Sequence, residues 1–106
     1  MDRLRRIDMV IKLLENEPDD LFLNYTLGLE YVAELNLPEA ENLFKKALEL
    51  NDDYIPAYYQ LGKLFESQTK NEEALHYFKK GLTKAKEQKN NKAINEFGEA
   101  IFMLED

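Results

Sequence analysis

The chain has no cysteine and no tryptophan, and it has a single histidine and a single serine. The lack of cysteine excludes disulfides, thiolate metal sites and thiol catalysis. No apolar run is long enough for a membrane span. Acidic residues interrupt the N-terminal arginines and no small-residue cleavage site follows, which disfavours a targeting peptide. The default expectation is a cytoplasmic protein.

A cationic surface is also lacking. The net charge is −7, from 14 basic and 21 acidic residues, whereas nonspecific nucleic-acid binding needs positive charge to displace counterions. One basic run exists without interleaved aromatic residues, and its members are Lys79, Lys80, Lys84, Lys86, Lys89 and Lys92. We interpret it as a solvated helix and loop, with a polyanion contact as the less favoured alternative. No nucleic-acid partner is expected.

What the sequence does contain is an internal repeat with a period of 34 residues. Nine positions between 21 and 54 hold the same residue as the position 34 further on. These identical pairs are Tyr25/Tyr59, Leu27/Leu61, Gly28/Gly62, Glu39/Glu73, Ala40/Ala74, Phe44/Phe78, Lys45/Lys79, Lys46/Lys80 and Leu48/Leu82. A period in this range predicts helical units that pack on their neighbours.

Each repeat unit is predicted to form two helices, because its apolar residues recur at three- and four-residue spacing. In the first unit Asp19 and Asp20 can cap the first helix, and Pro38 suits the first turn of the second. The caps expected in the second unit are Asp52 or Asp53, and Asn71. The flanks add two apolar stripes: Leu4, Ile7, Val10, Ile11 and Leu14 before the repeats, and Ala93, Ile94, Phe97, Ala100, Ile101 and Leu104 after them.

Two glycines lie in helix interiors, where glycine costs about 1 kcal/mol relative to alanine. We expect Gly28 and Gly62 at the crossing of the two helices of each unit, opposite Ala40 and Ala74. Without side chains at the crossing, the helix axes can approach closely. The alternative, a tolerated or kinking glycine, does not explain the alanine that follows each one at the same distance.

These residues resemble the tetratricopeptide repeat: a leucine–glycine pair, an aromatic residue three positions later, then an alanine, an aromatic and a small residue in the second helix. The resemblance covers residues 21 to about 88 and implies an all-α fold, a short right-handed α-solenoid of antiparallel helix pairs with about six helices. Asn24 departs from the usual aromatic residue, and Leu35 and Thr69 replace the common turn glycine.

The predicted organisation is one domain. It comprises an N-terminal flanking helix in residues 1–17, repeat one in 21–54, repeat two in 55–88 and a C-terminal capping helix in 90–105.

Catalytic and metal chemistry have little support. Ser67 and His76 fall on different predicted helices, with no nucleophile-elbow motif near them. Glu73 and His76 have the Glu-x-x-His spacing of di-iron bundles, but such sites need two of these motifs and further inward carboxylates. No glycine-rich phosphate loop is present. We expect no enzyme activity, no metal and no cofactor.

The resemblance implies a protein–protein interaction module whose concave face is built from the first helix of each unit. The residues that would line this face are Phe22, Tyr25, Thr26, Leu29, Val32, Tyr59, Gln60, Lys63 and Glu66. Some family members hold acidic C-terminal tails with a lysine-and-asparagine clamp. The corresponding positions here are Tyr25, Leu29 and Gln60, so the clamp lacks its cation. The implied partner is a peptide or protein of another kind.

Two alternatives stay open. The lining residues could be core, covered by the terminal helix or by a second subunit. The protein could also be a self-assembling structural protein that homodimerises through the groove or the last helix, where Phe102 and Met103 fall outside the capping stripe.

Overall fold

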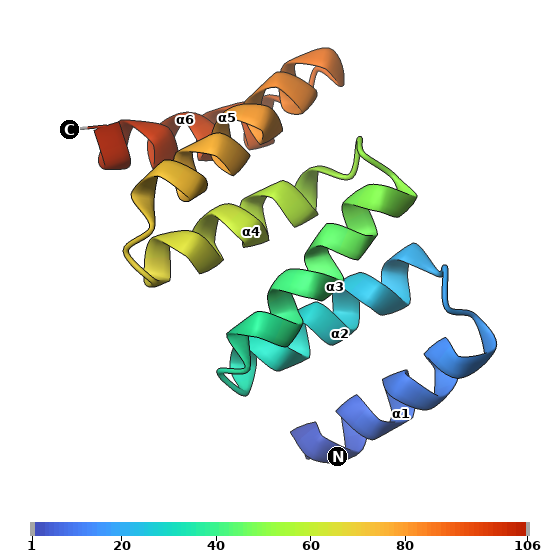
Figure 1. Ribbon diagram of the computed structural model, residues 1–106. Helices are drawn as coiled ribbons and strands as arrows, with labels where there is room; N and C mark the ends of the chain where they lie inside the picture. The colour runs from blue at the N-terminus through green and yellow to red at the C-terminus, as the bar shows by residue number, and fades with distance from the viewer. Residues whose placement is uncertain (1, 106) are drawn as a thin grey trace. The chain divides into compact units, whose positions relative to one another are not determined.

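The computed structural model describes residues 2–105, in which six helices and no strand are formed. The helices are α1 (Arg3–Asn16), α2 (Leu21–Ala33), α3 (Leu37–Leu50), α4 (Ile55–Ser67), α5 (Asn71–Glu87) and α6 (Asn91–Glu105). They group into two compact units, residues 1–52 with α1 to α3 and residues 53–106 with α4 to α6. Within the units, α2 and α3 run antiparallel, as do α4 and α5 (Figure 1). The predicted all-α fold of antiparallel helix pairs is confirmed.

The helix starts follow the predicted capping only in part. Asp20 caps α2 as expected, because its side chain accepts a 2.8 Å hydrogen bond from the Leu23 N–H. The caps predicted in the second unit are wrong: α4 follows Tyr54 without a side-chain cap, and Asn71 is the first residue of α5 rather than its cap. Proline in the first turn gives α4 a fixed backbone φ instead.

In the first unit, α1 packs on α2 through a small apolar cluster. Ile7, Val10 and Leu27 are buried there, and Ile11 and Leu14 are among the half-buried residues around them. Leu4, which the sequence placed in the same stripe, is exposed instead, because it lies in the first turn of α1, at the edge of the packed face.

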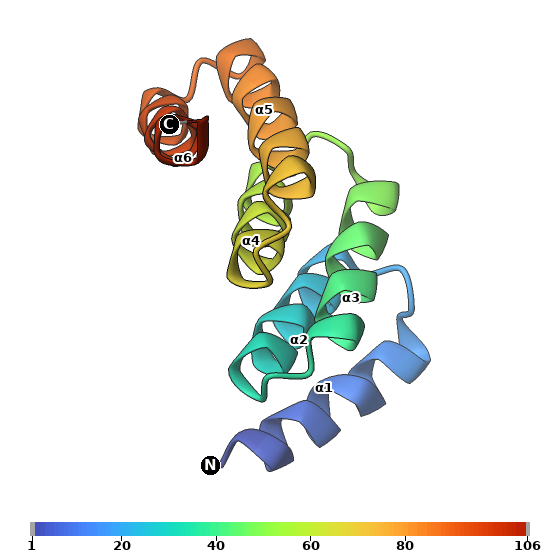
Figure 2. The same ribbon diagram turned by 60° about the vertical axis from the view of Figure 1, so that its left-hand side comes forward.

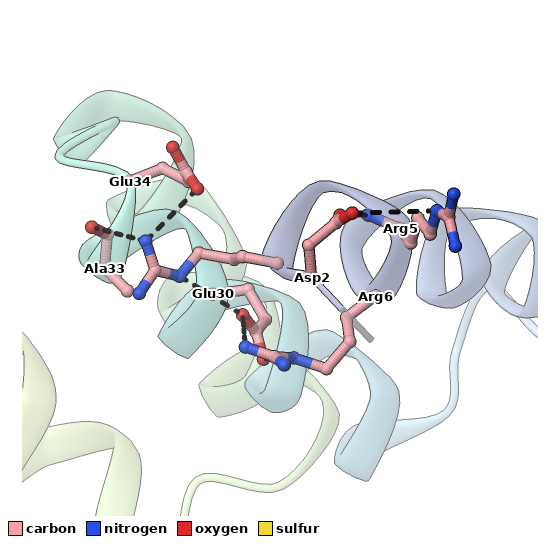
Figure 3. Close-up of polar contacts among 7 residues, drawn as sticks. Asp2, Arg5, Arg6, Glu30, Ala33 and Glu34 are labelled. Carbon is pink, nitrogen blue, oxygen red and sulfur yellow. Dashed lines mark hydrogen bonds and ion pairs between the residues drawn. The ribbon is translucent and has the colours of Figure 1, made fainter.

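Arginines of α1 add ion pairs to this packing. The Arg6 Nε lies 3.0 Å from a Glu30 carboxylate oxygen, and the Arg3 guanidinium lies 3.3 Å from Glu34 and 3.9 Å from Glu30 (Figure 3). The side chains of Arg3 and Arg6 are 42% and 45% exposed, and each such solvent-accessible pair contributes about 0–1 kcal/mol. They align α1 on α2, while the apolar cluster supplies most of the stabilisation.

The glycines do lie at the helix crossings, but their partners differ from those predicted. A Cβ on Gly28 would lie 2.6 Å from Cε1 of Phe44, and a Cβ on Gly62 would lie 2.3 Å from Cε1 of Phe78. Each glycine therefore forms a notch for a phenylalanine ring of the following helix. The three atoms nearest to each added Cβ all belong to this ring, so the phenylalanine, rather than the predicted alanine of the same helix, makes the closest contact.

A third notch, which the sequence analysis did not identify, joins α5 to α6. A Cβ on Gly81 would lie 2.4 Å from the Phe97 ring, and Phe97 is buried. The sequence does contain a signal: Ala93, Phe97 and Ala100 have the same spacing as Ala40, Phe44 and Ala47. The last helix therefore has the motif of the second helix of a repeat unit. It packs on α5 as that second helix packs on the first helix of its own unit.

Asn24, which replaces the aromatic residue usual at this position of the repeat, has a structural role. It is only 4% exposed, and its Nδ2 donates hydrogen bonds to the Pro18 carbonyl at 3.0 Å and the Asp20 carbonyl at 2.8 Å. The amide thereby ties the loop before α2 to the helix, whereas the equivalent Tyr58 fills its space with an aromatic ring.

The turns after α2, α4 and α5 share one backbone geometry without glycine. Leu35, Thr69 and Lys89 have φ angles of 62°, 57° and 56°. After α2, the Asn36 N–H donates to the Tyr31 carbonyl at 2.9 Å and the Leu35 N–H to Val32 at 3.0 Å. This is the Schellman arrangement, which normally uses glycine at the left-handed position.

Replacing Leu35 by glycine is therefore expected to raise the free energy of unfolding by about 0.5–1 kcal/mol. The left-handed conformation costs a residue with a Cβ about 1–2 kcal/mol, and the greater unfolded-state freedom of glycine offsets part of this gain. The Leu35 side chain is 81% exposed, so its removal leaves no cavity. Urea unfolding measures the change, and Leu35→Ala is the control that should show no gain. Equal stability of all three proteins would contradict the prediction.

Candidate functional site

The predicted lining residues of the first unit lie on one face of α2. Phe22 is 68% exposed and Leu29 is also exposed, whereas Tyr25 and Thr26 are half-buried. The Tyr25 ring packs on Phe44 with ring centroids 5.6 Å apart. The phenylalanine that fills the Gly28 notch therefore also restricts the position of the Tyr25 ring. This face of α2 is an apolar surface with two exposed side chains.

The equivalent residues of the second unit lie on α4. Tyr59 and Gln60 are half-buried, and Lys63 is exposed. The Tyr59 ring contacts Phe78 at 5.9 Å and Phe97 at 5.7 Å between centroids. Both phenylalanines fill glycine notches, so three helices fix the position of the Tyr59 ring.

A cavity of about 350 Å³ opens beside this tyrosine, between α4 and α6. We call it the α4–α6 pocket, and it is lined by Tyr59, Lys63, Glu66, Glu96, Glu99, Ala100 and Met103. Of the residues predicted for the concave face, Tyr59, Lys63 and Glu66 line this pocket, whereas Gln60 does not. The predicted residues of α2 belong to the first unit. In Figure 2, α6 is seen nearly along its axis, with α5 beside it.

Four lining residues, all from α6, were not predicted as site residues: Glu96, Glu99, Ala100 and Met103. The sequence predicts α6 mainly as a capping helix. The available signal is the position of Met103 outside the apolar stripe of this helix, since its side chain is 72% exposed and lines the pocket. Its neighbour Phe102 is 76% exposed but does not line the pocket.

Acidic groups dominate the charge of the α4–α6 pocket. Its lining has three carboxylates and one ammonium, and the Lys63 Nζ lies 3.4 Å from a Glu66 carboxylate oxygen. Just before α4, desolvation by burial raises the pKa of the Tyr54 hydroxyl, but this tyrosine does not line the pocket.

The two side chains considered for catalysis, Ser67 and His76, contact residues that are close to them in the sequence. The Ser67 hydroxyl donates a 2.7 Å hydrogen bond to the Leu64 carbonyl of its own helix. His76 is exposed and lies edge-on to Tyr77, with centroids 5.1 Å apart. Across residues 2–105, no three histidine or carboxylate side chains are grouped so that they could hold a metal ion. No helix in the same range is both long and apolar enough to cross a bilayer.

Comparison with known proteins decides the family. No family model and no curated protein matches the chain. Among solved structures, a tetratricopeptide repeat domain protein from Salinibacter ruber is 32% identical, with a TM-score of 0.78 over 83% of this chain and 89% of that one. The chain belongs to the tetratricopeptide repeat family. The resemblance inferred from the repeated residues is thereby confirmed.

Other tetratricopeptide repeat structures match the fold over nearly the whole chain. The TPR2B domain of yeast Sti1, in a complex with pHsp70, has a TM-score of 0.89 at 17% identity, over 98% of this chain and 83% of that one. The first tetratricopeptide repeat domain of Spaghetti (RPAP3), bound to the Hsp90 peptide SRMEEVD, has a TM-score of 0.75 at 26% identity, over 94% of this chain and 78% of that one.

Proposed function

We propose that this tetratricopeptide repeat chain is a non-enzymatic interaction module that binds a peptide or a partner protein in the α4–α6 pocket. The observation that carries the proposal is the pocket itself, about 350 Å³ beside an aromatic ring that the core holds in place. Rigid aromatic residues with a polar tip are effective contact residues, because little conformational entropy is lost on binding. The pHsp70 complex of the Sti1 domain and the Hsp90-peptide complex of the RPAP3 domain are consistent with this class of function.

The α2 face with Phe22, Tyr25, Thr26 and Leu29 is proposed as a second contact surface, in the first unit. Its exposed Phe22 and Leu29 side chains would lose apolar surface to water when a partner covers them.

Adjacent residues of α6 provide a matched test of the pocket. Met103→Ser is expected to reduce partner capture from a lysate at least about tenfold, since loss of an interface anchor costs about 2 kcal/mol. Phe102→Ser should retain the partner, because Phe102 is equally exposed but lies outside the lining. Affinity capture with quantitative mass spectrometry measures retention, and urea unfolding checks that both variants stay folded. Equal retention by the two variants would place the binding surface elsewhere.

Self-assembly is the second candidate function, favoured by the exposure of Phe102 and Met103 on α6. Sedimentation velocity across the micromolar range distinguishes it. A strict monomer removes this function, whereas a dimer that Phe102→Ser dissociates would establish it.

A further inference from the structure

The α4–α6 pocket has uncompensated negative charge. Lys63 is already paired with Glu66 at 3.4 Å. Within residues 2–105, neither Glu96 nor Glu99 forms an ion pair or hydrogen bond through its carboxylate. These two carboxylates lie three residues apart on α6 and both line the pocket, so they are neighbours on one face of the helix. The pocket therefore has two carboxylates available for a ligand.

The apolar part of the lining suits a long cationic side chain. Tyr59, Ala100 and Met103 line the pocket beside the two glutamates. Lysine and arginine bury their methylene stems on apolar surface while the charged head stays near water. The face of a tyrosine ring also attracts such a cation. An acidic segment would instead meet two like charges with only one paired lysine nearby.

From this geometry we infer that the pocket selects a basic, amphipathic segment of a partner protein, with an arginine or lysine between apolar residues. The inference rests on the proposed function and assigns the chemistry of its partner. The net charge of −7 strengthens it, because a negative protein attracts cationic segments at long range. The preference is opposite to the acidic SRMEEVD peptide of the RPAP3 complex.

Three matched peptides test the selectivity. Each has the sequence Ser-Leu-Xaa-Leu-Xaa-Leu-Ser with blocked termini, and Xaa is arginine, glutamine or glutamate. Fluorescence anisotropy with the full chain should give at least about tenfold tighter binding of the arginine peptide than of the glutamate peptide. Raising the salt from about 50 mM to about 500 mM should reduce this preference by screening.

Two double variants test whether the two glutamates of α6 cause the preference for the arginine peptide. Glu96→Gln/Glu99→Gln should reduce the preference for arginine over glutamate to less than about threefold. Glu15→Gln/Glu49→Gln is the control, because it changes the net charge equally at exposed positions of α1 and α3. The control should keep the preference, and an unchanged urea midpoint checks the fold of both variants.

The outcomes separate this inference from the proposed function. Equal affinity for the three peptides, an equal effect of the two double variants, or no binding by any peptide would overturn the inference. If the glutamine peptide or SRMEEVD binds, and Met103→Ser abolishes that binding, the proposed interaction module stands but has a different selectivity. Loss of arginine-peptide binding in Met103→Ser but not Phe102→Ser, together with the expected charge effects, supports both.

Discussion

Gly62→Leu is expected to lower the free energy of unfolding by about 2–3 kcal/mol. The first added atom alone would lie 2.3 Å from Cε1 and 2.5 Å from Cδ1 of Phe78. The ring is fully buried and has no room to move aside. Overpacking of this kind costs about 1–3 kcal/mol, occasionally more. It exceeds the gain of up to about 1 kcal/mol that leucine brings in helix propensity. Urea unfolding measures the difference.

Gly98→Leu is the matched control. It lies inside α6, and a Cβ there meets no atom within 4 Å. The same substitution should therefore leave stability unchanged or raise it by up to about 1 kcal/mol. Combining Gly62→Leu with Phe78→Ala should cost less than the sum of the two single changes, because the leucine occupies space that the ring vacates. If Gly62→Leu proved as stable as the wild type, the notch would not be a packing constraint.

Phe97→Ala is expected to have the largest effect, a loss of about 3–5 kcal/mol for a fully buried phenylalanine. The ring fills the Gly81 notch and contacts Tyr59 at 5.7 Å and Phe78 at 6.4 Å. Its removal should free Tyr59 as well, so binding in the pocket would be lost together with stability. Urea unfolding followed by circular dichroism measures the loss.

Phe102→Ala on the same helix is the control for Phe97→Ala. The Phe102 ring is exposed, and such surface changes stay within about 0.5 kcal/mol. A loss below about 1 kcal/mol in Phe97→Ala would contradict the assignment of α6 as an integral part of the second unit.

The repeat pattern determines which helices pair, and it was sufficient to predict the α2–α3 and α4–α5 pairs. It could not predict that Phe44 and Phe78 occupy the glycine notches, because spacing alone does not tell how far a side chain reaches across a crossing. The Gly81–Phe97 contact was missed for another reason: the last helix follows α5 at a spacing other than 34 residues.

Capping and site geometry were predicted less completely. Asp52 and Asp53 are residue types that favour the N-cap, but the N-cap position of α4 is held by Tyr54, so neither aspartate occupies it. In the site, the resemblance to the family implied Tyr59, Lys63 and Glu66 as lining residues, and these three line the α4–α6 pocket. The lining residues of α6 could not be predicted, because they depend on how α6 lies against α4, and the sequence pattern does not encode that arrangement.

The most direct test of the central claim, that a partner binds in the α4–α6 pocket, uses the methionine methyl groups. The chain has three methionines, of which Met103 lines the pocket and Met9 is exposed on α1. In the spectrum of ¹³C-methyl-methionine-labelled protein titrated with the arginine peptide, we expect the Met103 signal to shift to saturation while Met9 stays in place. A shift of Met9 with an unmoved Met103 signal would contradict the claim.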